Sequence, residues 1–358
     1  MPMGSGDGEV KILQVCPKYY PSVGGVEQHV KNISERLAHD NEVTVLTCDP
    51  SGQLPREELL NGVKVRRFRS FSPQDAYHIS LGMLSELRRS SFDVVHGHSY
   101  HAIPLLFSRY AKSNKFIINA YYHGHGHTPL RNMLIKFYKP FGEKALRQAD
   151  GIIALSNYEK ALLITDFNLG DKNIKIIPYG LVLEEFRDIE KEKREGKKIL
   201  YVGRLEEYKG VQYIIKALAL LEPDIHLEVI GKGPYEKHLV SISEEFGVEK
   251  RVHFYHDLTR KELLSRYASS DAFIMLSKYE SFSIVVAEAL ASKVPCVVAN
   301  ASALMEWIDD KNCFGIDYPI SIERLASLIT QVIGKEVSDV KLWDWDDVVA
   351  ETLRMYKE

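Results

Sequence analysis

The chain has 358 residues, of which 45% are hydrophobic and 27% are charged, as in ordinary globular proteins and unlike disordered or fibrous ones. No stretch approaches the roughly 20 uninterrupted apolar residues that a membrane-spanning helix requires. The net charge of −3 is unevenly distributed, because residues 1–178 hold 22 basic against 17 acidic residues and the remainder is acidic.

The first ten residues, MPMGSGDGEV, contain no basic segment followed by an apolar one, so we expect no secretory signal and a cytoplasmic location. The four cysteines are widely spaced and form no C-x-x-C pattern: Cys16, Cys48, Cys296 and Cys313. We therefore expect reduced thiols, with neither a disulfide framework nor a thiolate zinc site.

Short β-branched runs alternate along the chain with longer amphipathic segments. The runs are 11–16, 43–47, 93–96, 116–120, 151–156 and 174–177, then 198–203, 226–231, 252–255, 272–276 and 296–300. Continuous apolar strands of this length are typical of parallel sheets that are buried on both faces. Strand–helix alternation predicts an α/β protein built from doubly wound, Rossmann-like sheets.

The alternation is interrupted once, in the polar and strongly charged segment 178–198, which is bracketed by Pro178 and Gly196. Such a segment is typical of a linker. We expect an N-terminal domain at 1–178, and a linker with a C-terminal domain at 179–335. The remaining residues, 336–358, are expected to form a C-terminal helix.

Three strand ends carry motifs suited to an anionic ligand, because ligands of open parallel sheets bind beyond the carboxyl ends of the strands. Gly24 and Gly25 follow the first strand and precede a helix, so the backbone there can approach a phosphate. Arg204 and Lys209 follow the first strand of the second half, as two cations suited to a diphosphate. The alternative is that they are surface residues paired with neighbouring glutamates. Gly233 lies in another glycine-rich turn, 231-GKGPYE-236.

The stretch 277-SKYESFSIVVAEALASKVPCVVA-299 is the most informative. Glu280 precedes a predicted helix, and Glu288 lies within it among apolar residues, where a carboxylate requires a partner or a function. Carboxylates accept hydrogen bonds from vicinal hydroxyls, so the pair is suited to two sugar rings. The backbone amides of Phe282 and Ser283 would face a phosphate at the helix N-terminus.

These motifs together resemble the retaining glycosyltransferases of family 4, and the resemblance covers nearly the whole chain. It rests on 24-GGVE-27, on 202-VGRL-205 followed by 209-KG-210, and on the two glutamates spaced E-x7-E, which precede the strand after Pro295. It implies the GT-B architecture, with two Rossmann-like domains that face a cleft. It also implies that the C-terminal helix packs back on the N-terminal domain.

The resemblance assigns roles to the same residues. Arg204 and Lys209 would neutralise the diphosphate of a nucleotide-sugar, Glu288 would bind the ribose, and Glu280 the transferred sugar. Gly25 would meet the phosphate from the other domain. No metal or other cofactor is implied, because the cations supply the charge.

The chain departs from the family pattern at several positions. Ser283 and Ser302 stand where the family usually has glycine, and Tyr179 stands where it has asparagine before the linker glycine. A serine at position 283 still provides a backbone N–H, so catalysis is still expected.

Six of the thirteen histidines fall between positions 96 and 127. The H-x-H-x-H pattern of 123-HGHGHT-128 admits a metal site or ordinary polar loop residues as alternatives. The family resemblance favours a site for the sugar and the acceptor, with His123 as the catalytic candidate and His98 and His125 as further acceptor-side candidates.

The segment 130–148 mixes basic and aromatic residues, a composition that suits either an anionic lipid surface or a helix packed in the domain. The expectation is therefore a cytoplasmic or membrane-peripheral hexosyltransferase that uses a nucleoside-diphosphate donor and a hydroxyl acceptor, such as a lipid-linked one or a glycan. The alternatives are a sugar-nucleotide epimerase and a non-catalytic nucleotide-sugar-binding subunit. Nucleic-acid binding is not expected, because no recognisable module interleaves the basic and aromatic residues.

Overall fold

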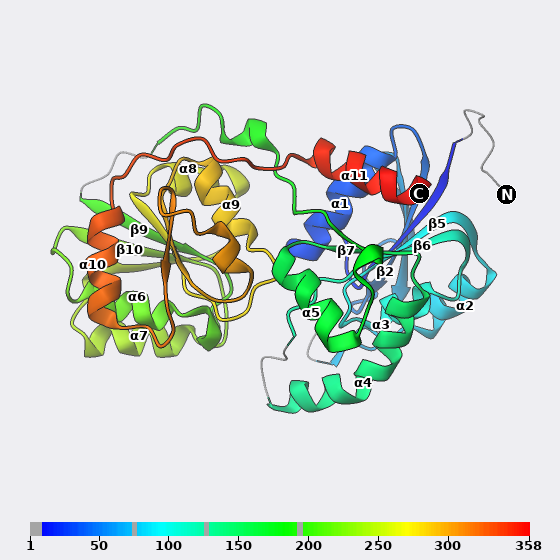
Figure 1. The fold of residues 1–358 in the computed structure, drawn as a ribbon, viewed down its shortest axis with the longest axis horizontal. Coiled ribbons are helices and arrows are strands. Elements are labelled where there is room, and N and C mark those ends of the chain that lie inside the picture. Colours follow the sequence, from blue (N-terminus) through cyan, green and yellow to red (C-terminus); the bar gives the residue numbers. More distant parts are fainter. Residues whose placement is uncertain (1–8, 74–76, 125–128, 192–195) are drawn as a thin grey trace. The chain divides into compact units, whose positions relative to one another are not determined.

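The computed structural model describes residues 9–73, 77–124, 129–191 and 196–358, with the backbone only for 129–135 and 172. The chain forms two compact units (Figure 1). The N-terminal unit comprises Met1–Gly180 and Trp345–Glu358, and the C-terminal unit comprises Leu181–Asp344. Both are mixed α/β units built on parallel sheets, so the predicted fold class is confirmed.

In the described part of the N-terminal unit, eight strands form one sheet in the order β3-β4-β2-β1-β5-β6-β7-β8. All neighbours are parallel except β3 and β4. The strands are β1 (Lys11–Val15), β2 (Glu42–Asp49), β3 (Glu57–Leu60), β4 (Val63–Arg69), β5 (Ser91–His98), β6 (Lys112–Asn119), β7 (Gly151–Ala154) and β8 (Ile174–Ile176). The helices are α1 (Gly25–Leu37), α2 (Leu81–Arg89), α3 (Ile103–Ser108), α4 (Pro129–Gln148), α5 (Asn157–Phe167) and α11 (Trp345–Lys357).

The C-terminal unit has a six-stranded parallel sheet within its described residues, in the order β11-β10-β9-β12-β13-β14. Its strands are β9 (Lys197–Val202), β10 (Ile225–Ile230), β11 (Val252–Tyr255), β12 (Ala272–Met275), β13 (Cys296–Ala299) and β14 (Cys313–Ile316). Its helices are α6 (Val211–Leu218), α7 (Glu236–Glu245), α8 (Arg260–Ala268), α9 (Ile284–Ala291) and α10 (Ile322–Val332).

Two layers of helices cover this second sheet. Helix α6 contacts α7 and α10, while α8 contacts α9, and the two groups lie on opposite sides of the sheet (Figure 1). Strands β12 and β13 are therefore buried along their whole length, which explains their uninterrupted apolar sequences.

Strands β3, β4 and β14 were not among the predicted ones. Strands β3 and β4 pair antiparallel at the sheet edge. Strand β3 begins with two glutamates, and β4 places basic residues between its apolar ones, so both lack a continuous apolar run. The basic cluster 64–69 belongs to β4, where Arg66 pairs with Glu57 and Glu86, and Arg67 pairs with Glu58.

The expectation that 336–358 is helical was wrong for its first part, because α11 begins only at Trp345. The preceding residues are not helical and are held by hydrogen bonds. Asn312 Oδ1 accepts hydrogen bonds from the N–H and the hydroxyl of Ser338, and the Leu181 N–H donates to the carbonyl of Trp343. Helix α11 contacts α1, and buried Trp345 packs against the rings of His29 and Tyr179.

Candidate active site

The two predicted cations follow β9 but have different surroundings. Arg204 has a side chain that is 66% exposed and forms an ion pair with Glu206 at 2.8 Å. Lys209 ends a 3₁₀ turn just before α6 and is mostly buried. Its ammonium lies 2.6 Å from Oε1 of Glu280. Only Lys209 is thus built into the interior, and Arg204 lies on the surface, as the alternative interpretation allowed.

The Lys209–Glu280 pair joins two strand ends of the second sheet. Burial alone would lower the pKa of Lys209, but the charge of Glu280 and its hydrogen bond outweigh burial and raise this pKa. The ammonium also lies 5.3 Å from the centre of the Tyr208 ring. A permanently charged lysine beside a carboxylate is able to bind a phosphate oxygen and a sugar hydroxyl at the same place.

A serine holds the backbone that carries Glu280. The hydroxyl oxygen of Ser302 accepts a hydrogen bond from the Glu280 N–H at 3.0 Å, and the Ala303 N–H donates to the Glu280 carbonyl. Ser302 has φ +51°, in the left-handed region that favours glycine. The glycine conformation of the family pattern is thus retained with a serine, which adds a hydrogen bond.

Ser283 is the N-cap of α9 and has φ +77° and ψ +79°, again in the left-handed region. Its side chain is buried, and its hydroxyl has no hydrogen-bond partner among the described residues. The adjacent Phe282 carbonyl accepts a hydrogen bond from the indole of Trp307, and the two rings make a T-shaped contact. The predicted phosphate-facing segment is therefore held in a strained conformation by the loop around Trp307.

Glu288 lies within α9 and is 8% exposed. Its two oxygens are bound by α8, which the sequence analysis did not single out. Arg260 Nη1 lies 2.5 Å from Oε1, and the Tyr267 hydroxyl donates to Oε2 at 3.1 Å. The spacing of seven residues places Arg260 and Tyr267 on one face of α8. Only the folded structure shows that this face contacts Glu288 on α9.

Gly233 supports the turn beside Arg204. A Cβ added at Gly233 would collide with the backbone of Leu205, whose N–H donates to the carbonyl of Lys232. The glycine is thus required for close backbone approach, and the turn lines the end of β9.

The N-terminal unit holds the remaining predicted residues. Gly24 is the extended N-cap of α1 and Gly25 is its first residue, and a Cβ at Gly24 would collide with the carboxylate of Glu27. This carboxylate lies at the helix N-terminus, where the sequence predicted a phosphate.

His98 is fully buried at the end of β5. Its Nε2 lies 2.6 Å from Oε1 of Gln14, and its Nδ1 lies 3.4 Å from the hydroxyl of Tyr121. His123 lies after β6, with its ring centre 5.0 Å from that of His101. His125 lies outside the described residues. The structure therefore places His98 in the core and His123, which is partly buried, in the segment that follows β6.

Glu159 was also missed by the sequence analysis. This buried residue at the start of α5 accepts hydrogen bonds from the N–H groups of Tyr122 at 2.5 Å and Leu155 at 2.7 Å. Burial raises the pKa of Glu159 to about 8, although both hydrogen bonds oppose the shift. Because Tyr122 precedes His123, the carboxylate anchors the backbone that carries the histidine.

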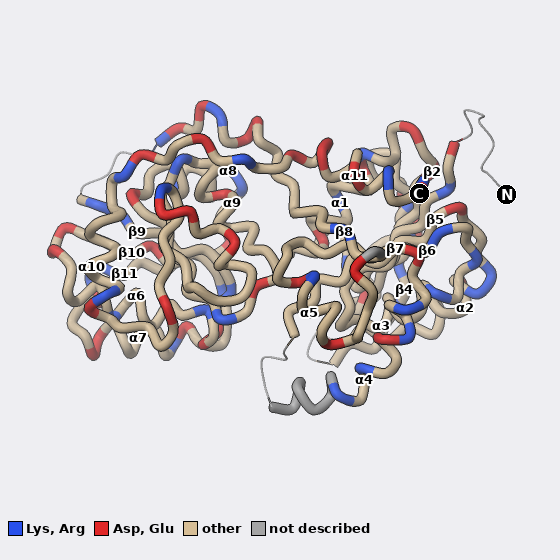
Figure 2. The backbone as a smooth tube through the Cα atoms, viewed as in Figure 1, with Lys and Arg blue, Asp and Glu red and all other residues tan. Residues whose placement is uncertain are grey.

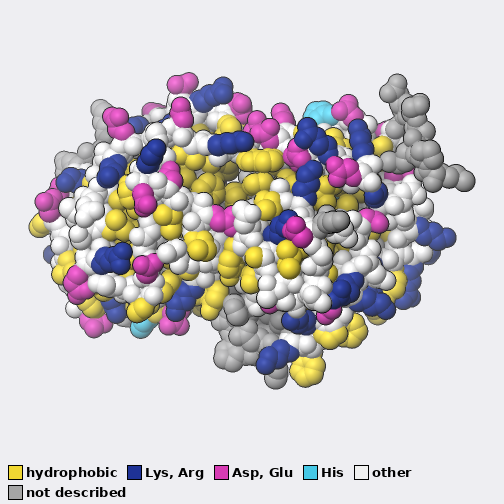
Figure 3. Space-filling view, viewed as in Figure 1, with side chains coloured by type: hydrophobic (Ala, Val, Ile, Leu, Met, Phe, Trp, Pro, Cys, Tyr) yellow, Lys and Arg dark blue, Asp and Glu magenta, His cyan; other side chains and the backbone are white. Residues whose placement is uncertain are grey.

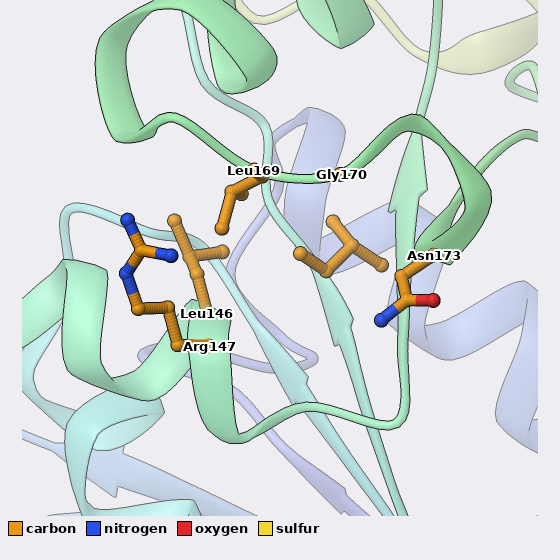
Figure 4. Close-up of a pocket in the computed structure, with 6 residues that line it drawn as sticks. Leu146, Arg147, Leu169, Gly170 and Asn173 are labelled. Atoms are coloured by element: carbon orange, nitrogen blue, oxygen red, sulfur yellow. The ribbon is translucent and has the colours of Figure 1, made fainter.

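Two pockets of the N-terminal unit lie away from the predicted residues. One, of about 180 Å³, is lined by Leu146, Arg147, Ile152, Leu169, Gly170 and Asn173 (Figure 4). Its single cation, Arg147, already donates to Glu143 and to the carbonyl of Phe167. The other, of about 430 Å³, lies at the amino ends of β1, β5 and β6.

Among the residues that the structure describes, no group of three or more His, Cys, Asp or Glu side chains is placed to bind a metal ion. His125 and His127 lie outside that set. No helix in the described part of the chain is long and apolar enough to span a membrane.

Solved structures with a similar fold identify the structural class of this protein. Over 97% of this chain and 98% of the other, the fold matches sucrose-phosphate synthase from Thermosynechococcus elongatus with a TM-score of 0.79 and 18% identity. Anabaena Alr3699/HepE, solved in complex with UDP-glucose, matches 97% of this chain and 100% of its own with a TM-score of 0.74 and 18% identity. The fold is that of the GT-B glycosyltransferases.

The family follows from the sequence. Residues 23–185 match the model described as Glycosyltransferase Family 4, and residues 183–342 match that of Glycosyl transferases group 1. An uncharacterized glycosyltransferase of Methanocaldococcus jannaschii is 28% identical over 97% of this chain and 98% of its own. The chain belongs to the family-4 type of glycosyltransferases, as the motifs predicted.

Proposed function

We propose that this protein is a retaining hexosyltransferase that moves a sugar from a nucleoside-diphosphate donor to a hydroxyl acceptor. The observation that carries the proposal is the mostly buried Lys209–Glu280 ion pair at the carboxyl end of the second sheet. One member is suited to phosphate and the other to sugar hydroxyls. The complex of Anabaena Alr3699/HepE with UDP-glucose supports the same donor class.

The proposed chemistry places charge stabilisation at the leaving group. The bond between the anomeric carbon and the phosphate oxygen breaks, and negative charge develops on the departing diphosphate. The acceptor hydroxyl oxygen bonds to the same anomeric carbon, and the hydroxyl proton passes to the departing diphosphate. In this proposal, Lys209 binds one oxygen of the departing diphosphate. The exposed guanidinium of Arg204 leaves Glu206 and binds a second diphosphate oxygen. A preorganised cationic hydrogen-bond donor of this kind stabilises the transition state by about 3 kcal/mol.

Thermal unfolding with a panel of nucleotide-sugars tests the donor. A ligand at 100 times its Kd stabilises the native state by about 2.7 kcal/mol, so the cognate donor will raise the Tm while unrelated nucleotides will not. The labelled donor is then incubated alone. A transferase gives only slow hydrolysis, whereas conversion to an isomeric nucleotide-sugar indicates an epimerase. If no nucleotide-sugar raises the Tm, the proposal is wrong.

We further propose that the acceptor is membrane-associated and that α4 contacts anionic lipid. Phe137 and Phe141 lie one helical turn apart and are 72% and 59% exposed. Lys136 and Lys144 are exposed on the same helix, and Figure 2 marks basic positions along α4. In the space-filling view, basic and apolar side chains lie together at this surface (Figure 3). Exposed aromatic residues beside lysines are typical of a surface that binds anionic bilayers.

Sedimentation with phosphatidylglycerol-containing vesicles tests this contact. The double substitution Phe137→Ser and Phe141→Ser is expected to reduce vesicle binding at least tenfold, because it removes two exposed aromatic contacts. Leu220→Ser removes a comparably exposed apolar side chain from the C-terminal unit and serves as the control. Equal binding by all three proteins would contradict the proposal.

A further inference from the structure

Helix α8 supplies both partners of the Glu288 carboxylate. The Arg260 guanidinium bonds to Oε1, and the Tyr267 hydroxyl donates to Oε2. A carboxylate has about four acceptor positions, so one position on each oxygen is still available after these two bonds. The two available positions match the two vicinal hydroxyls of a ribose.

The two partners also satisfy the Glu288 carboxylate in an apolar setting. Its neighbours on α9, Val286, Ala287, Ala289 and Leu290, are all buried. A buried carboxylate without hydrogen-bond partners in such surroundings carries a large desolvation cost. The arginine and the tyrosine offset that cost, and they fix the orientation of the carboxylate that hydroxyl recognition requires.

Arg260 is itself held from a second direction. Its Nε donates to Oε2 of Glu185 at 2.8 Å, and its guanidinium lies 5.4 Å from the centre of the Phe186 ring. Both residues belong to the 3₁₀ turn Leu183–Phe186, which begins three residues after the N-terminal unit ends at Gly180. The guanidinium is thus fixed between two carboxylates and a ring, and its geometry toward Glu288 is preorganised.

We infer that Arg260 is a positioning residue for the donor's ribose, acting through Glu288 with Tyr267 as its second support. The inference rests on the proposed function and deepens it, because it predicts that this protein distinguishes ribonucleotides from deoxyribonucleotides. If the Arg260–Glu288 contact only stabilised the fold, removing it would not change the preference for ribonucleotides over deoxyribonucleotides.

Isothermal titration with UDP, GDP and ADP first identifies the diphosphate that the unmodified protein binds. Its 2′-deoxy counterpart and inorganic pyrophosphate are then titrated into the same protein. We expect the ribonucleotide to bind at least tenfold more tightly than the 2′-deoxy form, because the missing hydroxyl loses a hydrogen bond to a charged group. In Arg260→Gln this ratio is expected to fall toward one, with pyrophosphate affinity unchanged.

Three further variants control for folding and charge. Lys261→Gln removes a neighbouring cation that is 88% exposed, and is expected to keep the ratio of the unmodified protein. Tyr267→Phe removes only the hydroxyl and is expected to reduce the ratio even if Arg260→Gln fails to fold. Arg260→Lys is expected to restore part of the ratio.

The outcomes separate the two proposals. If folded Arg260→Gln keeps the full preference for the ribonucleotide, Arg260 and Tyr267 do not position Glu288, but the donor proposal stands. If Arg260→Gln does not fold, a full preference in Tyr267→Phe has the same meaning. Failure of the unmodified protein to bind any of the three nucleoside diphosphates overturns the donor proposal, and this inference with it.

Discussion

The ammonium of Lys209 and the carboxylate of Glu280 lie 2.6 Å apart, although 71 residues separate them in the chain. Each follows a strand of the same parallel sheet, and the carboxyl ends of such strands converge at one edge. The pair brings an ammonium and a carboxylate together at this edge of the sheet. In the proposed function, the ammonium binds a phosphate oxygen of the sugar donor and the carboxylate binds its sugar hydroxyls.

Substitutions of Arg204 and Lys209 are expected to differ in their effect on stability, although both should reduce turnover. Arg204→Ala should reduce turnover about 100-fold while changing the free energy of unfolding by less than about 0.5 kcal/mol, because its ion pair is exposed. Lys209→Met should also reduce turnover, but it leaves Glu280 without its buried partner and should cost roughly 2 kcal/mol of stability. Steady-state kinetics and urea unfolding measure both effects. An unchanged rate in Arg204→Ala would remove this residue from the mechanism.

We expect activity to persist in a chelator. If Arg204 and Lys209 neutralise the diphosphate as proposed, no divalent metal is needed for that purpose, so EDTA should leave the initial rate unchanged. The assay compares enzyme dialysed against EDTA with enzyme supplied with Mg²⁺ or Mn²⁺. Loss of activity that added metal restores would contradict the expectation.

Ser283→Gly should stabilise the fold. The left-handed backbone at this N-cap costs a non-glycine residue roughly 1 kcal/mol, and glycine relieves it. For a unit of this size the Tm should rise by about 2 °C. Ser302→Gly is the comparison, because Ser302 is also left-handed but its hydroxyl accepts the Glu280 N–H, so the gain there should be smaller. Equal shifts in both variants would show that this hydrogen bond contributes nothing.

Acid should destabilise the N-terminal unit through its buried histidines. Burial lowers the pKa of His29 to about 3, and burial with the nearby charge of His29 does the same for His96. An unfolded histidine titrates near pH 6.5. The stabilisation is therefore complete above pH 6.5 and is lost as the pH falls toward 3, by up to about 1.4 kcal/mol per pH unit for each residue.

Urea unfolding between pH 7.5 and 5 measures this loss. His29→Phe is the informative variant, because neither nitrogen of His29 has a hydrogen-bond partner among the described residues, while its ring contacts Trp345 and Tyr179. The phenylalanine preserves the ring contacts without titrating, so the variant should lose less stability in acid than the unmodified protein. Identical pH profiles would show that His29 does not contribute.

Glu159→Ala should be strongly destabilising. It leaves the buried N–H groups of Tyr122 and Leu155 without their acceptor, at roughly 1–3 kcal/mol each. Glu159→Gln keeps one acceptor oxygen and should lose about half as much stability. Glu143→Ala, which removes an exposed ion pair with Arg147, should change the unfolding free energy by less than about 0.5 kcal/mol. A small effect in Glu159→Ala would indicate that water replaces the carboxylate.

The sequence by itself determined the fold class and the glycosyltransferase family, because apolar periodicity and the order of short motifs are local properties of the chain. It indicated Lys209, Glu280 and Glu288 as candidate site residues, since a cation after a strand, a glutamate before a helix and a carboxylate among apolar neighbours are all visible without coordinates. Only the tertiary structure decided that Lys209 is paired with Glu280, that Arg204 lies on the surface and that His98 is buried. It alone showed Arg260 as a partner of Glu288. Partners and burial depend on which segments pack together, and residues far apart in the chain meet only when the sheets form.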